Sequence, residues 1–211
     1  MADLKMLKHG LLNLSILTII TLVASSCATD TSKSDKSISS LATGTVTSKP
    51  LSISSSEREK YRKAIAALDN GQLEQAKNIF SEISDANPSL AGPYTNIALI
   101  HYKNKKYVDS FKLTEKAIKL NPKQAEAYNL RGQLNIAAGK VHDAKKDYRE
   151  AIKLKPDYAN AQYNLALVYD IYLQEIELAI KHYEIYMSLL KSPDEPTKEW
   201  ISHLKGTLKD E

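Results

Sequence analysis

The amino-acid sequence predicts an all-α protein in which pairs of helices stack in a row. Seven glycines and seven prolines in 211 residues leave long uninterrupted stretches, as helices require. Similar residues also return every 34 positions: the small residues Ala64, Ala98, Gly132 and Ala166, and the prolines Pro88, Pro122 and Pro156. A period of roughly 20 to 50 residues indicates a repeat architecture, in which each repeat buries its apolar face against its neighbours.

Each repeat divides into two helices. In the third repeat, Gly139 favours the end of the first helix, and Pro156 stops the second because proline has no amide donor. Gly132 and Ala144 are small, so they allow the two helices to approach closely. The apolar surface of this pair comes from Leu134, Val141, Tyr148, Ile152 and Leu154.

The pattern resembles the tetratricopeptide repeat (TPR), a 34-residue helix pair with small residues at the crossing, an aromatic residue on the second helix and a terminal proline. The resemblance covers residues 57–192 as four repeats, 57–90, 91–124, 125–158 and 159–192. It implies a TPR α-solenoid of four helix pairs. In the fourth repeat, the intervals from Ala144 to Ala179 and from Tyr148 to Tyr183 are 35 residues. We therefore expect one inserted residue, which lengthens the turn within "YDIYLQEIE".

A C-terminal capping helix is predicted within residues 193–211, after the loop "SPDEP". Trp200, Ile201, Leu204 and Leu208 recur there at helical spacing and share one face. A stacked array needs such a cap at its open end. The alternative is a helix on a membrane surface, which would need more Lys and Arg. The fourth repeat and this helix resemble the end of small envelope repeat proteins of Gram-negative bacteria.

Residues 1–26 have the layout of a lipoprotein-type signal peptide, with Met1 or Met6 as the start. Lys5 and Lys8 precede 17 uncharged, largely apolar residues, Gly10 to Ser26. This run is shorter than the roughly 20 residues of a membrane-spanning helix. An uncleaved membrane anchor is the alternative.

Cys27 is the only cysteine, so no intramolecular disulfide can form. The stretch "VASSC" resembles a bacterial lipobox, in which the cysteine is lipidated and becomes the mature N-terminus. The resemblance implies acylation of Cys27, for example with palmitate, and a place in the outer membrane facing the periplasm, because Ala28 rather than aspartate follows. Two or more acyl chains anchor a protein stably, at about 0.8 kcal/mol per buried methylene. An unmodified free thiol is the alternative.

The sequence of residues 27–56 predicts a disordered tether that begins at the lipidated Cys27. From residue 28 to 56, 15 of 29 residues are Ser or Thr, without apolar periodicity. Such a chain has an end-to-end distance on the order of 30 Å. The folded domain would then stand clear of the membrane.

The charge pattern argues against nucleic acid as a partner, and the absence of catalytic motifs argues against an enzyme. From residue 57 onward, 24 Lys and Arg are interspersed with 22 Asp and Glu, unlike a phosphate-binding stripe. Asp143 and Asp147, one turn apart among lysines, predict an exposed face. The sequence contains no zinc-ligand spacing, Gly-rich phosphate loop or nucleophile elbow. We expect a non-enzymatic protein without metal or cofactor.

The TPR resemblance also implies where a ligand binds, because successive first helices line a concave groove that receives an extended peptide or a partner's helix. By repeat position, the peptide-binding groove would be lined by Tyr61, Ile65, Leu68, Thr95, Asn96, Leu99, Tyr102, Asn129, Gln133, Ile136, Tyr163, Asn164, Leu167 and Ile171. Asparagines offer hydrogen bonds to a ligand's backbone, and tyrosines offer contact area at low entropic cost. The alternative for each side chain is packing against adjacent helices or the cap.

TPR proteins that clamp the acidic tail of a cytosolic chaperone use Lys, Asn and Arg at five positions. Here those positions hold Tyr61, Ile65, Asn96, Glu126 and Leu130, so only the asparagine matches. We expect instead a scaffold that binds another envelope protein, as family members do in assisting a pilus secretin or an outer-membrane assembly machine. The alternative is a self-associating envelope protein whose groove or cap forms homo-oligomers.

Overall fold

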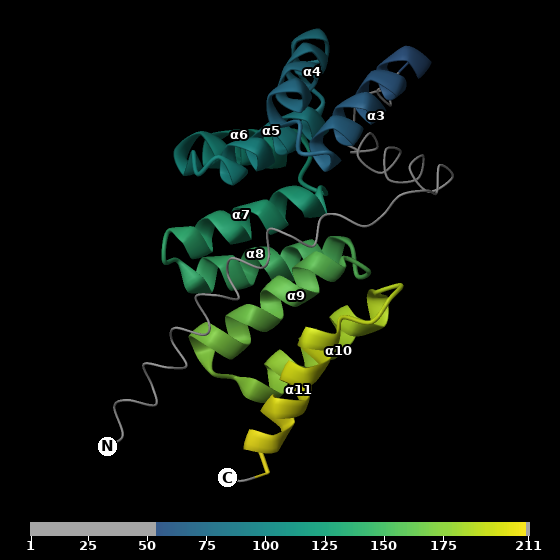
Figure 1. The fold of residues 1–211 in the computed structure, drawn as a ribbon. Coiled ribbons are helices and arrows are strands. Elements are labelled where there is room, and N and C mark those ends of the chain that lie inside the picture. Colours follow the sequence, from purple (N-terminus) through teal and green to yellow (C-terminus); the bar gives the residue numbers. More distant parts are fainter. Residues whose placement is uncertain (1–53, 210–211) are drawn as a thin grey trace.

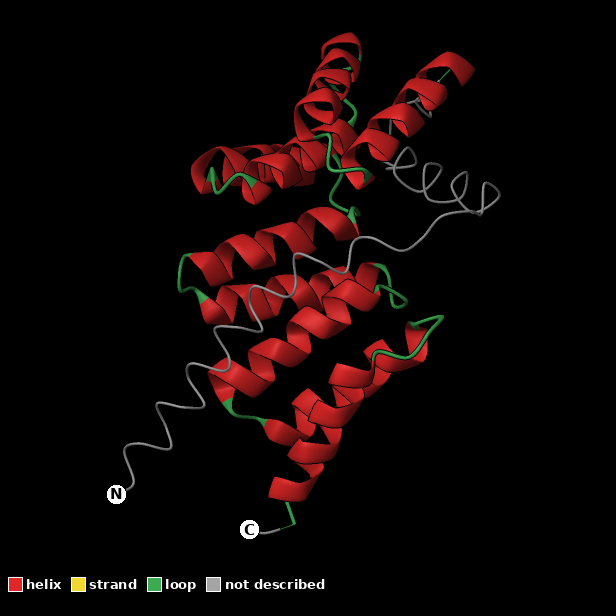
Figure 2. Ribbon diagram, viewed as in Figure 1, coloured by secondary structure: helices red, strands yellow, loops and turns green. Residues whose placement is uncertain are grey.

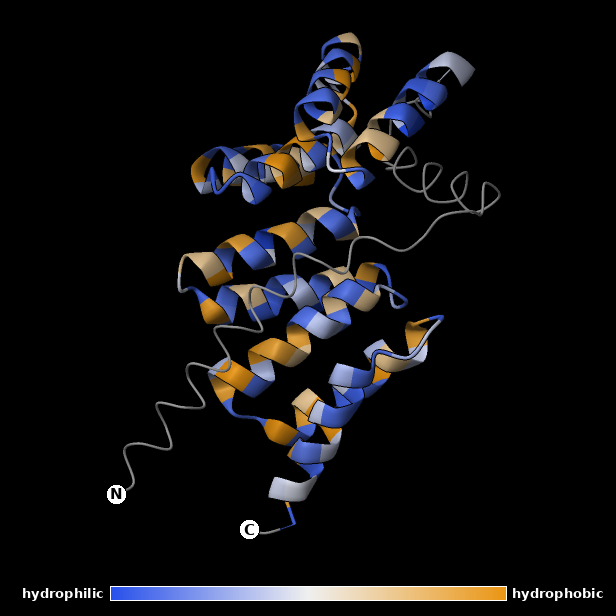
Figure 3. Cartoon of the chain, in the orientation of Figure 1, coloured by the Kyte–Doolittle hydropathy of each residue, from blue (hydrophilic) through white to orange (hydrophobic). Residues whose placement is uncertain are grey.

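The computed structural model describes residues 54–209, which form nine α-helices, one π-helical segment and no strand (Figures 1 and 2). The predicted signal, Cys27 and nearly all of the predicted tether lie outside the described residues. Along each helix, hydrophobic residues alternate with hydrophilic ones (Figure 3), the pattern of amphipathic helices that bury one face.

Eight of the helices form four hairpin pairs that stack in chain order (Figure 1). The pairs are α3 (Ser55–Asp69) with α4 (Leu73–Ala86), α5 (Ala91–Lys103) with α6 (Tyr107–Leu120), α7 (Ala125–Ala137) with α8 (Val141–Leu154), and α9 (Ala159–Leu167) with α10 (Ile176–Leu189). The π-helix η1 (Val168–Leu173) continues α9, and α11 (Glu195–Thr207) follows α10. The predicted all-α solenoid of four helix pairs with a C-terminal helix is thus confirmed.

The solenoid begins at Ser54, slightly before the predicted start of the first repeat, because Ser54 caps α3. Its side-chain oxygen accepts a hydrogen bond from the Glu57 backbone N–H (3.2 Å), and Glu57 Oε2 accepts one from the Ser54 backbone N–H (2.8 Å). This capping box satisfies two amides that lack partners inside the helix. Asn87, just after α4, also donates to Glu57. These bonds, with the Ser54 side chain first, hold the pKa of Glu57 below its usual value.

Small residues set the close approach of the helices within each pair, as the periodicity predicted. Ala64, Ala98 and Ala166 are completely buried. In the third pair, a Cβ atom on Gly132 would lie 2.5 Å from Cε1 of Tyr148. The ring therefore occupies space that is open only because residue 132 has no side chain.

The turns inside the four pairs share one geometry. Gly71 (φ 74°), Lys105 (φ 58°), Gly139 (φ 72°) and Gln174 (φ 54°) are in the left-handed conformation. Each stands two positions before the first residue of the second helix. Lys105 and Gln174 adopt this conformation at a cost of roughly 1–2 kcal/mol, which glycine avoids.

The extra residue of the fourth repeat lies in its first helix, so the prediction of a longer turn is wrong. From Ala159 to the left-handed Gln174 the interval is 15 residues, whereas from Ala125 to Gly139 it is 14. The π-helical segment Val168–Leu173 takes up the difference. A wider turn of this kind absorbs one residue without interrupting the helix, and it rotates the side chains that follow.

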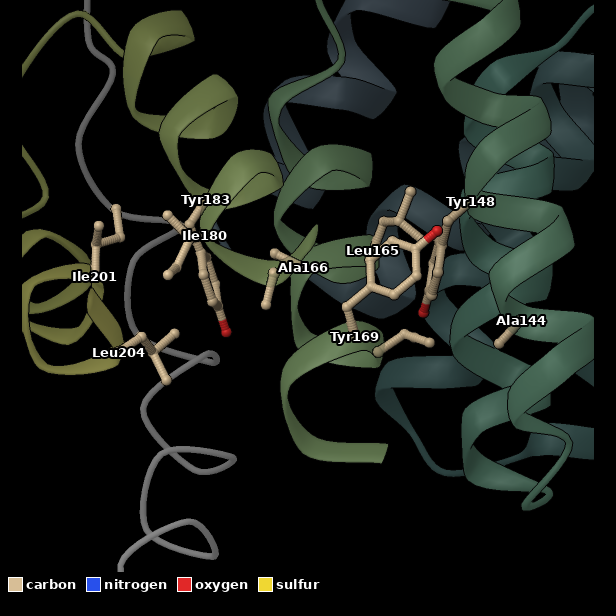
Figure 4. Close-up of a cluster of buried hydrophobic side chains, with 11 residues drawn as sticks. Ala144, Tyr148, Leu165, Ala166, Tyr169, Ile180, Tyr183, Ile201 and Leu204 are labelled. Carbon is tan, nitrogen blue, oxygen red and sulfur yellow. The ribbon is translucent and has the colours of Figure 1, made fainter. Parts of the chain in front are cut away.

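An apolar cluster ties the last two pairs to the C-terminal helix (Figure 4). It includes Tyr148 from α8, Leu165 and Ala166 from α9, Ile180 and Tyr183 from α10, and Ile201 and Leu204 from α11. Trp200 and Leu208 pack against its edge. The apolar face of α11 therefore covers the end of the stack, as predicted for a cap.

Candidate peptide-binding surface

The surface predicted to bind a peptide lies on α3, α5, α7, α9 and η1, the first helices of successive pairs. Six apolar side chains on these helices are partly buried and pack with one side onto the core: Ile65, Leu68, Leu99, Tyr102, Ile136 and Leu167. Gln133 is likewise partly buried, and Ile171 in η1 is exposed. These side chains leave part of their surface for contact with a ligand.

Three predicted groove residues are instead buried. Tyr61 packs edge-on against Phe80, with ring centroids 5.3 Å apart. The Thr95 hydroxyl donates a hydrogen bond to Gln124 Oε1 (3.1 Å). Asn129 lies between neighbouring helices with only 6% of its surface exposed. For these three positions the structure shows packing against adjacent helices, so they support the surface from below.

The asparagines of this surface connect adjacent repeats. Asn96 Nδ2 donates hydrogen bonds to the Tyr61 hydroxyl (2.7 Å) and to the Gly92 carbonyl oxygen (3.0 Å). Two repeats later, Asn164 Nδ2 donates to Asn129 Oδ1 (2.9 Å). Both links join residues 35 positions apart, so they are the same contact made twice. The amide protons of Asn96 that we expected to serve a ligand are used to fix the register of the first helices.

Tyrosines gather where the turns of the second, third and fourth pairs meet. The rings of Tyr102 and Tyr107 have centroids 5.6 Å apart. Burial raises the pKa of Tyr102, and the nearby Tyr107 and Tyr172 phenols add to that rise. Burial likewise raises the pKa of Tyr148, and the nearby Tyr102 and Tyr172 phenols add to that rise. Side chains from α5, α6, α8 and η1 thus converge at this end of the surface.

Tyr163, the predicted groove residue in the middle of α9, packs against two other rings. Its ring centroid lies 5.7 Å from that of Tyr183 and 4.9 Å from that of Tyr186, both on α10. Burial raises the pKa of Tyr163, with smaller effects from Asp194 and Asp170. Such packing restricts the ring to one orientation, which lowers the entropic cost of any contact it makes.

Asp170 in η1 joins three elements, a role that sequence reasoning missed. Its Oδ2 atom accepts hydrogen bonds from Trp200 Nε1 of α11 (2.7 Å) and from the Tyr183 hydroxyl of α10 (3.0 Å). Burial raises the pKa of this carboxyl, although the two donors act in the opposite direction. The 35-residue spacing pointed to this part of the fourth repeat. The sequence alone did not show that the Asp170 side chain faces α11 from the π-helical turn.

A buried ion pair within the third pair, Arg131 of α7 with Asp147 of α8, extends through Glu115 of α6 to the second pair. Arg131 Nη2 lies 2.6 Å from Asp147 Oδ1, and Arg131 Nη1 lies 2.8 Å from Glu115 Oε1. Asn135 Nδ2 donates to Asp147 Oδ2 (2.9 Å). Burial opposes the charge on Arg131, yet the two carboxylates raise its pKa overall. The predicted exposed acidic face is therefore wrong for Asp147, which is 5% exposed, because Arg131 one helix away supplies its partner.

Within residues 54–209, no three His, Cys, Asp or Glu side chains are grouped so as to hold a metal ion. Over the same range, no helix combines the length and the hydropathy needed to span a membrane. The chemistry that this surface offers is contact by apolar and aromatic side chains.

Comparison with known families finds matches to one kind of repeat. A model described as TPR repeat matches residues 136–170, and two described as tetratricopeptide repeat match residues 113–146 and 61–125. Rat serine/threonine-protein phosphatase 5 is 32% identical over 89 residues, 42% of this chain and 18% of the phosphatase. Human RNA polymerase II-associated protein 3 is 30% identical over 87 residues, 41% of this chain and 13% of that protein. The match thus spans less than a fifth of either relative.

Solved structures show the same arrangement of helices. The Pseudomonas aeruginosa pilF structure superimposes with a TM-score of 0.64 at 18% identity, covering 73% of this chain and 69% of that one. The structure of the APC/C hetero-tetramer Cut9-Hcn1 gives 0.61 at 17% identity, covering 72% of this chain and 30% of that one. The first TPR of Spaghetti (RPAP3), bound to the HSP90 peptide SRMEEVD, gives 0.50 at 25% identity, covering 57% and 96%.

Proposed function

We propose that this chain, whose folded part is a tetratricopeptide-repeat solenoid, is a scaffold that binds an extended peptide or a helix of another protein. The observation that carries the proposal is a repeated set of partly buried apolar side chains on successive first helices. One row holds Ile65, Leu99 and Leu167, and a second row holds Leu68, Tyr102 and Ile136. Members of a row stand at multiples of 34 residues, so they line up across the stack.

Two such rows suit a ligand with apolar side chains at regular spacing, such as one face of an amphipathic helix. A peptide bound to the first TPR of Spaghetti provides a precedent for ligand binding by this kind of helix stack. The ligand proposed here differs from a chaperone tail. Of the five clamp positions only Asn96 matches the chaperone-binding pattern, and Asn96 is hydrogen-bonded to Tyr61.

The partner is proposed to be another protein of the bacterial envelope. This part of the proposal rests on the signal-like residues 1–26, on Cys27 in "VASSC" and on the Ser- and Thr-rich residues 28–56. Together they suit a protein tied by acyl chains to the outer membrane on its periplasmic side.

Site-specific cross-linking of the full chain in cells would test the binding surface. A photo-reactive amino acid is placed at Leu99, and a matched control is placed at Lys146, which is exposed on α8. We expect a defined partner to cross-link from position 99 only, and Tyr102→Ala to abolish that product. Identical cross-linked products from both positions would contradict binding of the partner at the first-helix rows.

Metabolic labelling with a palmitate analogue would test the anchor separately. The wild-type chain should be labelled and should fractionate with the outer membrane, whereas Cys27→Ala should be unlabelled. Equal labelling of both chains, or none of either, would contradict acylation at Cys27 and leave the peptide-binding proposal standing.

A further inference from the structure

We propose that two copies of this chain associate through the side of the solenoid formed by the turns inside the second, third and fourth pairs. These turns lie on the left of the view in Figure 1. We call this side the turn edge and define it as residues 102–112, 136–141 and 170–178. It is distinct from the rows of first-helix residues proposed to bind a peptide, apart from Tyr102 and Ile136, which lie where the two surfaces meet.

The large hydrophobic side chains that are exposed within residues 54–209 are confined to the turn edge. The six large hydrophobic side chains that are exposed in the described part of the chain are Tyr107, Val108, Phe111, Ile171, Tyr172 and Leu178. The first three belong to the second pair and the last three to the fourth. Single exposed hydrophobic residues are ordinary on protein surfaces, but the collection of all six along one side indicates a surface that is covered by a partner.

The repeat itself does not require apolar residues at positions 108 and 111. Val108, 69% exposed, corresponds at 34-residue intervals to Glu74 in the first pair and His142 in the third. Phe111 corresponds to Lys77 in the first pair. These pairs fold with charged or polar residues there, so Val108 and Phe111 are not needed to build a helix hairpin.

The two ends of the turn edge carry opposite charge. Residues 103–112 hold Lys103, Lys105, Lys106 and Lys112 against the single acidic residue Asp109. Residues 170–178 hold Asp170, Glu175 and Glu177 and no basic residue.

The lysines at the basic end lack close partners within the described helices. None of the four forms an ion pair within 4.0 Å there. Lys103 attracts the carboxylate of Asp69, and Lys106 that of Glu74, only over a longer distance. At the acidic end, Glu175 lies 3.9 Å from Lys145, and Glu177 is exposed. Charge is therefore available at both ends to pair with another molecule.

This arrangement is complementary to itself after a two-fold rotation. If the axis passes near the turn of the third pair, the basic end of each copy faces the acidic end of the other, and both contacts form together. Ala137, Ala138 and Gly139 are exposed at that turn, and their small size lets the copies approach. A closed dimer satisfies both ends, whereas a head-to-tail contact leaves one end of each chain unpaired.

The exposed apolar area fits a weak but specific dimer. At roughly 150–250 Å² per fully exposed large side chain, the six residues present about 500 Å² on each copy. Two copies would bury about 1,000 Å², near the lower limit for specific interfaces. We therefore expect a dissociation constant in the micromolar range. Four of the six residues in the first-helix rows, Ile65, Leu68, Leu99 and Leu167, lie outside the turn edge. The dimer would therefore leave most of the proposed peptide-binding surface accessible, and the proposal does not rest on the peptide-binding function.

Charge reversal in the full chain tests both the dimer and its orientation. One variant carries Lys106→Glu and Lys112→Glu, and the other carries Glu175→Lys and Glu177→Lys. A control with Lys119→Glu and Lys123→Glu reverses the same number of charges at the other end of α6 and in the loop that follows. Sedimentation equilibrium measures the dissociation constant of each, and circular dichroism verifies the helix content.

We expect each edge variant to weaken dimerisation at least tenfold and the control to resemble the wild type. An equimolar mixture of the two edge variants should dimerise again, because opposite charges face each other at both contacts of the mixed dimer. Restoration by mixing also shows that both variants are folded. A monomeric wild type at about 100 µM, or a mixture that stays monomeric, would overturn the proposal.

Discussion

Replacing Asp170 by alanine should detach the C-terminal helix from the rest of the solenoid. The substitution leaves the Tyr183 hydroxyl and the Trp200 N–H without their shared acceptor. A buried polar group that loses its partner costs about 1–3 kcal/mol, and Tyr183 is only 2% exposed. Trp200 is partly exposed, so water replaces some of its bond and the cost there is nearer 1 kcal/mol. The expected destabilisation of the cap is therefore about 2–4 kcal/mol.

Trp200 is the only tryptophan in the chain, so its fluorescence reports on the cap while circular dichroism reports on all the helices. Repeat arrays can lose their ends before their centre. With a urea slope of about 2 kcal/mol per molar, the fluorescence midpoint of Asp170→Ala should fall by about 1–2 M, ahead of the dichroism midpoint. Asp170→Asn keeps an acceptor oxygen and should cost about 1 kcal/mol. An unchanged fluorescence midpoint in Asp170→Ala would refute the reasoning.

Three further predictions concern other contacts. Gly132→Ala should destabilise the protein by about 1–2 kcal/mol in urea denaturation, because overlap with the buried tyrosine ring outweighs the better helix propensity of alanine, whereas Gly206→Ala, with open space around it, should stabilise by up to about 1 kcal/mol. Arg131→Met should lower the free energy of unfolding by about 3–5 kcal/mol, because it leaves the carboxylate of Asp147 buried without a cation. Adding Asp147→Asn should recover part of that loss. If the double variant loses the sum of the two single losses, the ion pair does not contribute. The raised pKa of Asp170 means that its carboxyl group binds a proton more tightly in the folded than in the unfolded state. The stability that this proton contributes is therefore lost as pH rises from about 4 through the folded pKa. In urea denaturation at pH 4 to 6.5, Asp170→Asn should lack this decrease of stability with pH.

The stacking of helix pairs was predictable because one physical requirement recurs in every repeat. Two helices can approach closely only where side chains are small, so Ala64, Ala98, Gly132 and Ala166 report the same crossing four times. Helix propensity alone is a weak signal, but a spacing repeated through the chain is not. The cap followed from the same logic, since an open end exposes an apolar face that some element must cover.

The side-chain contacts between repeats were not predictable, because they depend on distances between residues about 16 to 35 positions apart. Asn96 has the chemistry of a ligand contact, and only the position of Tyr61 shows that its amide is already used. Asp147 reads as part of a solvated face until Arg131 is found beside it. The spacing did reveal one extra residue in the fourth repeat, yet a longer turn and a wider helix fit that count equally well.

The left-handed turn residues carry an implication for engineering. Pairs one and three use Gly71 and Gly139 there, whereas pair two uses Lys105 and accepts a strained backbone. A designer who replaced Lys105 by glycine would relieve the strain of the left-handed backbone at this turn. The same change would remove one positive charge from the lysines of residues 103–112, so the more stable protein would dimerise less tightly.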